Sequence, residues 1–574
     1  MSGLAVRLNA CFGARSELAG TSLRAFCLAL EQNESEGFDA WRTIAGRLYG
    51  SALDKLGSSL RGPLRQTCVD AHTTTGDRVL FGLQTYYATV VYHTAVRLCG
   101  ANAAQVLDEP LFCWPQNGRF SEIAKRVDRI AAAVAECCTG IDRRTVLSPH
   151  DLFKPLYESI FPRPLRHALG EYYTPDWLAE HVLRQAGWPG DRNLRLLDPS
   201  CGSGTFLMAA IELLRKETAC PLTREQQLAR ILASVTGFDL NPLAVLAARA
   251  NYLIAVRDLL PDDNPVAIPV LCCDAILDGP PTGTAETAKP FDLLVGNPPW
   301  IAWDNLPDAY RRATLPLWQR YGLFSLNGNA GRHGGAKKDL AMLLLYTAAD
   351  RYLRDGGRVA MVVSQTLLHT HGAGDGFRRF RLGPDGGPLA ALRVDDLSRL
   401  RPFPEAASCT ATLLLEKGRP TVYPVPYVCW LPDEKHGRRG GPASRQRTHL
   451  AEPIDAGRSG SPWFVRPQHL HTPLNALVGP SAYTARLGAN GAGANGVYWV
   501  EVVGAAEGGV QIRNLAGAGR RKVESVQCVV EPDLLFPLVR WGDVARYRAR
   551  PAAHILMPQD FATRTGLPED LLRT

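Results

Sequence analysis

Apolar residues recur at intervals of three and four along most of residues 15–145, as in residues 85–104 and 121–138. That spacing places them on one face of a helix, so we predict an all-helical N-terminal domain over residues 1–150. Between residues 194 and 364 the pattern changes to short runs of leucine and β-branched residues that alternate with helical stretches. Such alternation is typical of a parallel sheet with crossover helices.

The expected strands of this sheet cover residues 194–198, 234–239, 266–274, 291–299 and 357–364. They predict an α/β fold class, with a Rossmann-like, doubly wound sheet in a domain of residues 151–418. After residue 418 glycine and proline become frequent and the helical period fades. Residues 418–430 and 495–504 have the pattern of strands, so we expect a β-rich C-terminal region over residues 419–574.

Composition supports a globular protein of several domains. The chain has 574 residues, 46% of them hydrophobic and 21% charged, which is ample apolar material for more than one core and excludes a disordered chain. The 64 Lys and Arg residues against 56 Asp and Glu residues give a net charge of +8. This modest excess favours a polyanionic partner only where the basic residues cluster.

The start of the chain lacks the pattern of a secretion signal, and no run approaches 18 apolar residues. We therefore expect a cytoplasmic protein without a membrane span. The 14 cysteines are dispersed, and the closest pairs, Cys137 with Cys138 and Cys272 with Cys273, are adjacent in sequence. Adjacent cysteines have the spacing of neither a zinc site nor a redox pair, so we predict reduced thiols and no metal.

A glycine-rich turn follows the first expected strand, between Asp198 and a helix that contains Phe206 and Leu207. Gly202 and Gly204 lack a Cβ atom, which permits a sharp turn and a close approach of a ligand, and the helix start adds free N–H groups. A tight connection without a ligand has the same pattern, so the turn is moderate support for a binding site.

Acidic residues also end the next two strands. Asp239 ends the second strand, where a carboxylate can accept hydrogen bonds from both hydroxyls of a ribose. Asp274 ends the third strand, where it could bind an adenine amino group. One such carboxylate alone is more often a helix N-cap, but acidic residues at three successive strand ends predict a nucleoside site.

The fourth strand ends in the sequence GNPPW, residues 296–300. Asn-Pro-Pro followed by an aromatic residue resembles the catalytic loop of S-adenosylmethionine-dependent amino-methyltransferases. With GEYYTP at residues 170–175, the chain resembles an adenine-N6 DNA methyltransferase of the gamma motif order. In that order the cofactor motifs precede the catalytic loop and target recognition follows, and the resemblance covers roughly residues 150–420.

The chemistry of an exocyclic amine explains this loop. The amine lone pair is delocalised into the ring, so the enzyme must localise it. The Asn297 side-chain oxygen and the Pro298 carbonyl can accept the two N6 hydrogens and aim the lone pair at the sulfonium methyl group. Pro298 and Pro299 hold the loop rigid, and Trp300 offers a stacking surface for an extruded base. The alternative is a rigid turn after a buried strand.

The resemblance also implies the residues that bind S-adenosylmethionine. Those that fold over or line its methionine part are Tyr172, Tyr173, Thr174, Pro175, Asp198, Gly202 and Gly204. By the same resemblance, Asp239 holds the ribose and Asp274 the adenine amino group. Cys201 lies inside the turn without a histidine nearby in sequence, and we assign it no catalysis.

The resemblance implies that Phe403 packs against the flipped target base, with a core phenylalanine as the equal alternative. The family commonly has aromatic residues after Asp-Leu, whereas Asp339 and Leu340 are followed by Ala341, a departure that concerns the shape of the base pocket.

Basic residues that could contact DNA phosphates are Lys337, Lys338, Arg438, Arg439 and Arg521. A solvated surface is the commoner explanation for any one of them. Residues 529–549 resemble the junction at which a target-recognition region begins in long methyltransferases of this kind, which implies that residues 419–574 are part of such a region.

The predicted function is methylation of adenine N6 in double-stranded DNA with S-adenosylmethionine, in a restriction-modification or phage-defence system and with a separate specificity subunit as a further partner. Methylation of protein glutamine or RNA is the rival enzyme activity, which the length and GEYYTP disfavour. A fused endonuclease is disfavoured because the N-terminal region lacks an Asp followed by Glu-x-Lys. A DNA-binding subunit without activity is disfavoured by the intact Asn297 loop.

Overall fold

The computed structural model divides into two compact units, residues 1–478 and 479–574, and each is described here by itself. The described residues are 2–32, 36–50, 75–107, 109–116, 121–142, 150–161, 163, 166, 173–190, 194–217, 222–261, 265–280, 289–324, 338–372, 374–404, 409–432, 444–470, 482, 493–519, 523–560, 563 and 565–568.

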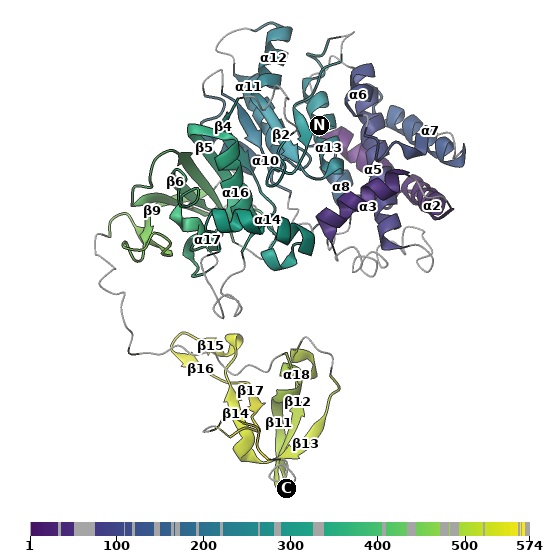
Figure 1. Cartoon of the computed structure of the whole chain (residues 1–574). Helices are drawn as coiled ribbons and strands as arrows, with labels where there is room; N and C mark the ends of the chain where they lie inside the picture. Colours follow the sequence, from purple (N-terminus) through teal and green to yellow (C-terminus); the bar gives the residue numbers. More distant parts are fainter. Residues whose placement is uncertain are drawn as a thin grey trace. The chain divides into compact units, whose positions relative to one another are not determined.

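The first unit begins with helices, as predicted (Figure 1). They are α1 (Ser2–Phe12), α2 (Glu17–Gln32), α3 (Glu36–Tyr49), α5 (Gly76–Cys99), α6 (Ala101–Val106), α7 (Ser121–Cys137) and α8 (Lys154–Ile160). In α7 the buried residues Ile123, Val127, Ile130 and Val134 recur every three or four positions, so one face packs on the core. Helix α5 is buried along most of its length and contacts α2, α7 and α13.

A ten-stranded sheet forms the centre of this unit, in the order β10-β9-β8-β6-β7-β5-β4-β1-β2-β3. Its first five strands are β1 (Leu196–Asp198), β2 (Val235–Asp239), β3 (Val270–Cys272), β4 (Phe291–Gly296) and β5 (Leu353–Ser364). They pair in parallel, and each lies within or overlaps a strand expected from sequence. The strand order reverses direction between β1 and β4, which is the point where doubly wound sheets bind ligands.

Helices cover both faces of the sheet, which confirms the predicted α/β, Rossmann-like fold class. These helices are α10 (Asp176–Ala186), α11 (Thr205–Lys216), α12 (Arg224–Ser234), α13 (Pro242–Val256), α14 (Asp308–Arg320), α16 (Leu340–Arg351) and α17 (Thr366–His369). Adjacent residues of β1 point to opposite faces: Leu196 belongs to one buried cluster and Leu197 to the other. The cluster that contains Leu196 continues through α13 into α5, so the N-terminal helices and the sheet share a core.

The sheet continues beyond the expected domain boundary at residue 418. Its further strands are β6 (Leu389–Asp396), β7 (Thr410–Lys417), β8 (Val425–Leu431), β9 (Arg445–Pro453) and β10 (Trp463–Pro467). Strand β8 pairs in parallel with β6, and β9 pairs antiparallel with β8. Strands β8, β9 and β10 therefore extend the central sheet and belong to the first unit.

The second unit is β-rich, as predicted for this part of the chain. Its elements are α18 (Asn495–Tyr498), β11 (Trp499–Ala506), β12 (Gly509–Asn514), β13 (Gln527–Val530), β14 (Leu535–Leu538), β15 (Val544–Ala545), β16 (Arg548–Ala549) and β17 (Ala553–Leu556). The strand expected over residues 495–504 begins only at Trp499, because residues 495–498 form a helical turn. Among the described residues, none of the helices combines the length and the apolar character that crossing a lipid bilayer requires.

Candidate functional site

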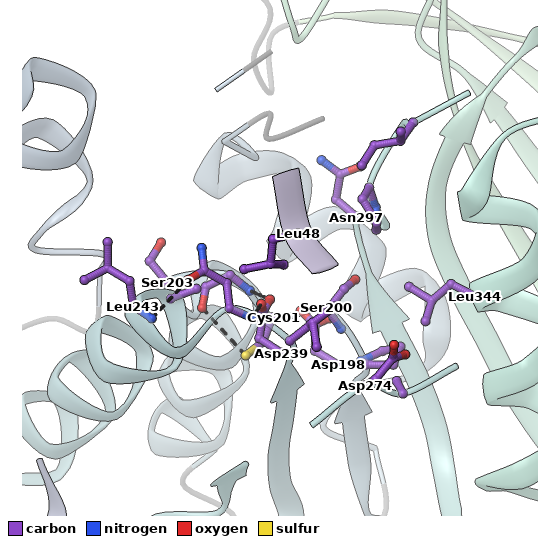
Figure 2. A pocket seen from close by; sticks show the side chains of 18 of the residues that line it. Leu48, Asp198, Ser200, Cys201, Ser203, Asp239, Leu243, Asp274, Asn297 and Leu344 are labelled. Carbon is purple, nitrogen blue, oxygen red and sulfur yellow. Dashed lines mark hydrogen bonds between the residues drawn. The ribbon is translucent and has the colours of Figure 1, made fainter. Parts of the chain in front are cut away.

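A cavity of about 240 Å³ lies where β1, β2, β3 and β4 end, at the point where the strand order reverses (Figure 2). Its lining is mostly apolar, and it includes the carboxylates of Asp198, Asp239 and Asp274 together with Asn297. Figure 2 shows these residues gathered around one space, although they come from four strand ends. The structure therefore brings together the acidic residues and the Asn297 loop that the sequence analysis singled out.

The glycine-rich turn has the backbone that requires glycine. Gly202 and Gly204 have φ angles of 55° and 94°, in the left-handed region. A Cβ atom built on Gly202 would meet nothing within 4 Å, so a ligand can lie directly against this backbone. Helix α11 begins at Thr205, and its free N–H groups face the end of the turn.

Asp239 joins the end of β2 to this turn. Its Oδ2 accepts a hydrogen bond from the Gly202 N–H at 2.9 Å, and its Oδ1 accepts one from the Asn241 N–H at 2.8 Å. Each carboxylate oxygen can accept two hydrogen bonds, so both keep capacity for a ligand hydroxyl. Burial raises the pKa of this carboxyl group, because the charged form loses its hydration.

Asp198 is almost fully buried and accepts a hydrogen bond from the Ser200 N–H at 3.1 Å. Burial, with the nearby charge of Asp239, raises the pKa of Asp198 to about 8. A Cβ atom on Gly296, whose φ is 151°, would lie 2.6 Å from the Asp198 carboxylate. Only glycine therefore fits just before the Asn297 loop, and this packing requirement is one that the sequence analysis did not identify.

Asp274 caps the turn that follows β3. Its Oδ1 accepts hydrogen bonds from the N–H groups of Ile276 and Leu277 and from the Tyr310 hydroxyl. Among the described residues its Oδ2 accepts none, so this oxygen is available to a ligand donor. Burial raises the pKa of this carboxyl group as well.

The Asn297 loop is fixed by the segment that precedes α10. The Asn297 Nδ2 donates a hydrogen bond to the Thr174 Oγ1 at 3.2 Å, and Thr174 is buried. This contact joins two motifs that are more than a hundred residues apart in the sequence. With its amide nitrogen held in this way, the Asn297 side-chain oxygen has a defined direction. Pro298, the next residue, is buried.

Two aromatic rings meet beside this loop. The Trp300 and Phe403 rings lie 5.4 Å apart in a T-shaped arrangement. Trp300 is half-buried, whereas Phe403 is 6% exposed and belongs to the buried cluster on one face of the sheet. Phe403 is thus a core residue, as the alternative interpretation had it, and it also contacts the Asn297 loop. Its contact with a flipped base stays a prediction.

Tyr173 lines the cavity and packs against Tyr157 of α8 at 5.6 Å. Pro175 follows Thr174 and is the N-cap of α10. Tyr172, which we expect on the same side of the site, lies outside the described residues.

Several residues that line the cavity come from the N-terminal helices and were not identified from sequence. They are Arg47, Leu48 and Tyr49 at the end of α3, Tyr87 of α5 and Tyr157 of α8. Among the described residues that line the cavity, Arg47 alone is basic. No local sequence motif marks these residues. The packing of the N-terminal helices on one another and of α5 on α13 brings them to the site.

Lys338 is not the surface phosphate contact that we predicted. It is 2% exposed, and its Nζ donates a hydrogen bond to the Gly372 carbonyl at 2.8 Å. Burial lowers the pKa of Lys338 to about 8. Its ammonium group anchors the loop after α17 and is not presented to a partner.

The other four predicted phosphate contacts lie outside the described residues; they are Lys337, Arg438, Arg439 and Arg521. Cys201 is buried, and burial raises the pKa of its thiol well above the usual value, so it lacks the character of a nucleophile. Asp339 caps α16 through the Ala341 N–H at 3.1 Å.

A buried network behind the cavity holds the glycine-rich turn. The Asn251 Nδ2 donates hydrogen bonds of 2.9 Å to the Asp151 Oδ1 and to the Ser203 carbonyl, and its Oδ1 accepts one from the Leu152 N–H. The Ser203 hydroxyl donates to the other oxygen of Asp151. One asparagine of α13 thus joins the turn to the residues before α8.

Comparison with known proteins gives matches for part of the chain. Residues 148–382 match the family model described as N-6 DNA Methylase. Adenine-specific methyltransferase PglX of Streptomyces coelicolor is 32% identical over 113 residues, which cover 18% of this chain and 9% of that protein. Type II methyltransferase M.BstVI of Geobacillus stearothermophilus is 28% identical over 167 residues, which cover 27% of this chain and 29% of that protein.

The chain spans less than a third of the length of either curated relative. The cryoEM structure of the DrdV-DNA complex aligns with 77% of this chain and 44% of its own chain, with a TM-score of 0.50 and 17% identity. That likeness shows the fold. The family match confirms the resemblance that the motifs indicate.

The network around Asn251 generates a first prediction. Asn251→Ala should lower the free energy of unfolding by about 3 kcal/mol, because it leaves the buried Leu152 N–H and Ser203 carbonyl without this partner. Denaturant unfolding would measure this difference. Asn305→Ala is the matched control, since Asn305 is exposed. Equal stability of the two variants would contradict the role of the network.

Proposed function

Because residues 148–382 match the N-6 DNA methylase family, we propose that this chain transfers a methyl group from S-adenosylmethionine to the exocyclic N6 of an adenine flipped out of double-stranded DNA. The observation that carries the proposal is the meeting, at one edge of the sheet, of a carboxylate-lined cavity, the Asn297 loop and the Trp300–Phe403 pair. A nucleoside cavity alone would fit many classes of enzyme. An amide and two prolines beside it are better suited to accepting the hydrogens of a target amino group.

The residues of the cavity fit S-adenosylmethionine. The open space at Gly202 admits a ligand against the backbone, and the carboxylates favour a ligand that carries positive charge. Asp239 would hold the ribose hydroxyls, and the Asp274 Oδ2 would accept from the adenine amino group. Tyr173 and Thr174, with Tyr172 and Pro175 beside them, would enclose the methionine part. When bound, the sulfonium group supplies an activated methyl.

In the proposed reaction the Asn297 Oδ1 and the Pro298 carbonyl accept the two hydrogens of the target amine. Two acceptors draw the nitrogen away from planarity and turn its lone pair toward the methyl group. The hydrogen bond from Asn297 Nδ2 to Thr174 keeps the amide oxygen in place before the substrate arrives, so little reorganisation is needed. Trp300 and Phe403 would form the walls against which the flipped base lies.

The setting that we propose is a restriction-modification or phage-defence system, since the relatives named above are an adenine-specific and a type II methyltransferase. The partners would be double-stranded DNA and a specificity or defence-system subunit. Lys337, Arg438, Arg439 and Arg521 stay proposed contacts to the DNA backbone.

Transfer of tritium from labelled S-adenosylmethionine tests the proposed function. Incubation with duplex DNA, followed by digestion to nucleosides, should give label in N6-methyladenine. Label on protein or RNA in a mixed substrate assay, or on cytosine, would contradict the proposal.

Removal of the Asp239 carboxylate tests the cofactor site. A pair of charge-assisted hydrogen bonds is worth on the order of 2 to 3 kcal/mol, so Asp239→Ala should weaken the binding of S-adenosylmethionine by roughly 30- to 150-fold. Titration calorimetry would measure the dissociation constant. Asp304→Ala removes the same charge from an exposed position after the Asn297 loop and should bind as the wild type does. Unchanged affinity in a folded Asp239 variant would refute this assignment.

Asn297 should matter for chemistry and not for cofactor binding. We expect Asn297→Ala to lower methyl transfer by about 100-fold or more, the scale for one preorganised group at the reacting atom. Its dissociation constant for S-adenosylmethionine should stay within about threefold of the wild-type value, because Asn297 is proposed to touch the target amine. Single-turnover transfer and calorimetry separate the two effects, with Asn305→Ala as the control. Normal transfer by the Asn297 variant would overturn the proposed mechanism.

The raised pKa of Asp198 predicts that cofactor binding releases protons. Near pH 7 this carboxyl group is largely protonated, since its pKa is about 8, and a cationic ligand favours the ionised form. The raised pKa of Asp198 also affects the free energy of unfolding of the free protein. Its stabilising contribution is complete below the ordinary pKa of aspartate and is lost as pH rises through about 8. Because a cationic ligand favours the ionised form of Asp198, the affinity for this ligand should increase with pH up to about 8.

Calorimetry at pH 7 in buffers of different ionisation enthalpy measures these protons. The apparent binding enthalpy should vary with the buffer for the wild type and vary less for Asp198→Asn, which has no proton to release. Equal dependence in both proteins would show that Asp198 is not the source.

A further inference from the structure

A second cavity, of about 430 Å³, lies on the extension of the sheet and has a different character. It is lined by one face of β8 and β9, by the residues that follow β6, and by His369 of α17. Its basic members are Arg399, Arg447, His369 and His449. We call this cavity the basic groove.

The sheet places the basic groove at the edge where the Asn297 loop lies. Strand β8 runs parallel to β6, which runs parallel to β5, because both β5 and β6 pair antiparallel with β7. Strand β9 runs the opposite way, so its first residues lie at the edge where the parallel strands end. Arg447 pairs with Cys429 and His449 with Tyr427, and residues paired in this way project from the same face.

Among its described lining residues the groove has two guanidinium groups and one carboxylate, so its net charge is positive. Arg399 and Arg447 are exposed, and among the described residues neither forms a salt bridge. The one carboxylate of the groove, Asp396, already has partners: its Oδ1 accepts from the Ser398 N–H at 2.9 Å, and its Oδ2 accepts from the Tyr427 hydroxyl at 2.9 Å. These donors hold Asp396 away from a salt bridge, and the two arginines outnumber this one carboxylate, so the groove can attract an anion.

The basic groove and the Trp300–Phe403 pair belong to opposite faces of the sheet, since Tyr427 packs in one buried cluster and Phe403 in the other. One short segment at the edge of the sheet joins them. After Asp396 the chain makes a turn in which the N–H groups of Leu400 and Arg401 both donate to the Leu397 carbonyl. Arg399 lies in this turn. Arg401 has a φ of 49°, a left-handed conformation that costs free energy in a residue with a side chain. The same segment then reaches Phe403, so it carries a groove arginine and a wall of the proposed base pocket four residues apart.

We propose that the basic groove binds the phosphodiester backbone of double-stranded DNA beside the flipped adenine. A flipped base stays bonded to its sugar and phosphates, so the backbone must pass close to the segment that holds Phe403. Arginine suits this role because its planar guanidinium can donate two parallel hydrogen bonds to one phosphate. The inference rests on the proposed function, and it assigns DNA contacts to residues that the sequence motifs do not mark.

The test uses the full chain with Arg399→Gln and Arg447→Gln combined. Binding of a labelled duplex is followed by fluorescence anisotropy between about 0.05 and 0.3 M salt. Each phosphate contact contributes about 0.9 to the slope of log affinity against log salt, so the double variant should lose about 2 from this slope. Its affinity at the lowest salt should fall by roughly 10- to 100-fold.

The matched control is Arg126→Gln with Arg129→Gln on α7, which removes the same charge. Figure 1 shows α7 and β9 on opposite sides of the first unit. We expect this control to bind duplex DNA within about threefold of the wild type. Arg447→Lys, which keeps the charge, should retain most of the slope. The affinity of each variant for S-adenosylmethionine reports whether the site is still folded.

The outcomes separate the inference from the proposed function. If the wild type binds and methylates duplex DNA but the double variant has the same affinity and slope, the basic groove is not a DNA contact and only the inference fails. An equal loss in the α7 control would also overturn it, since any arginine would then serve. If the wild type neither binds nor methylates duplex DNA, both the proposed function and the inference fail.

Discussion

The arrangement of the site depends on burying carboxylates at the ends of parallel strands. Asp198 and Asp239 are buried near one another in the cavity. Burial raises the pKa of both carboxyl groups, and the charge of Asp239 adds to the rise at Asp198. Backbone N–H groups of the glycine-rich turn and of residues 200 and 241 offset part of this cost. Protonation of Asp198 or the entry of a positively charged group relieves the rest of this cost, so the electrostatics of the cavity favour the cationic nucleoside that we propose as its ligand.

Close packing joins this arrangement to the Asn297 loop. Asp198 occupies the space that a side chain at Gly296 would need, so the carboxylate-lined cavity and the Asn297 loop are in direct contact. On the other side the loop is held by Thr174. The network around Asn251 then fixes the glycine-rich turn from behind. In the proposed reaction, a loop held at both ends would offer its acceptors to the target amine at little entropic cost.

The parts that sequence predicted are those that local chemistry determines. Short apolar runs in the sequence predicted the strands from β1 to β5. The glycines of the turn, and the acidic residues at the ends of three successive strands, predicted the residues of the site. The parts that it missed depend on contacts between distant segments. No local pattern shows that α3 reaches the cavity, that Lys338 is buried against Gly372, or that β8 adds to the sheet beyond residue 418.

Phe403 shows how one residue serves both a core and a site. It packs in the buried cluster beneath the sheet edge and touches Trp300, so its position is set by the interior of the protein and not by a substrate. The segment that carries it begins at Asp396, whose two oxygens bind Ser398 and Tyr427 and so fix the start of the turn. A strained residue, Arg401, lies between these two anchors. Since strain persists only where the surroundings enforce it, a backbone held at Asp396 and at Phe403 accounts for the conformation of Arg401. The same two anchors set Arg399 in a defined place relative to the proposed base pocket.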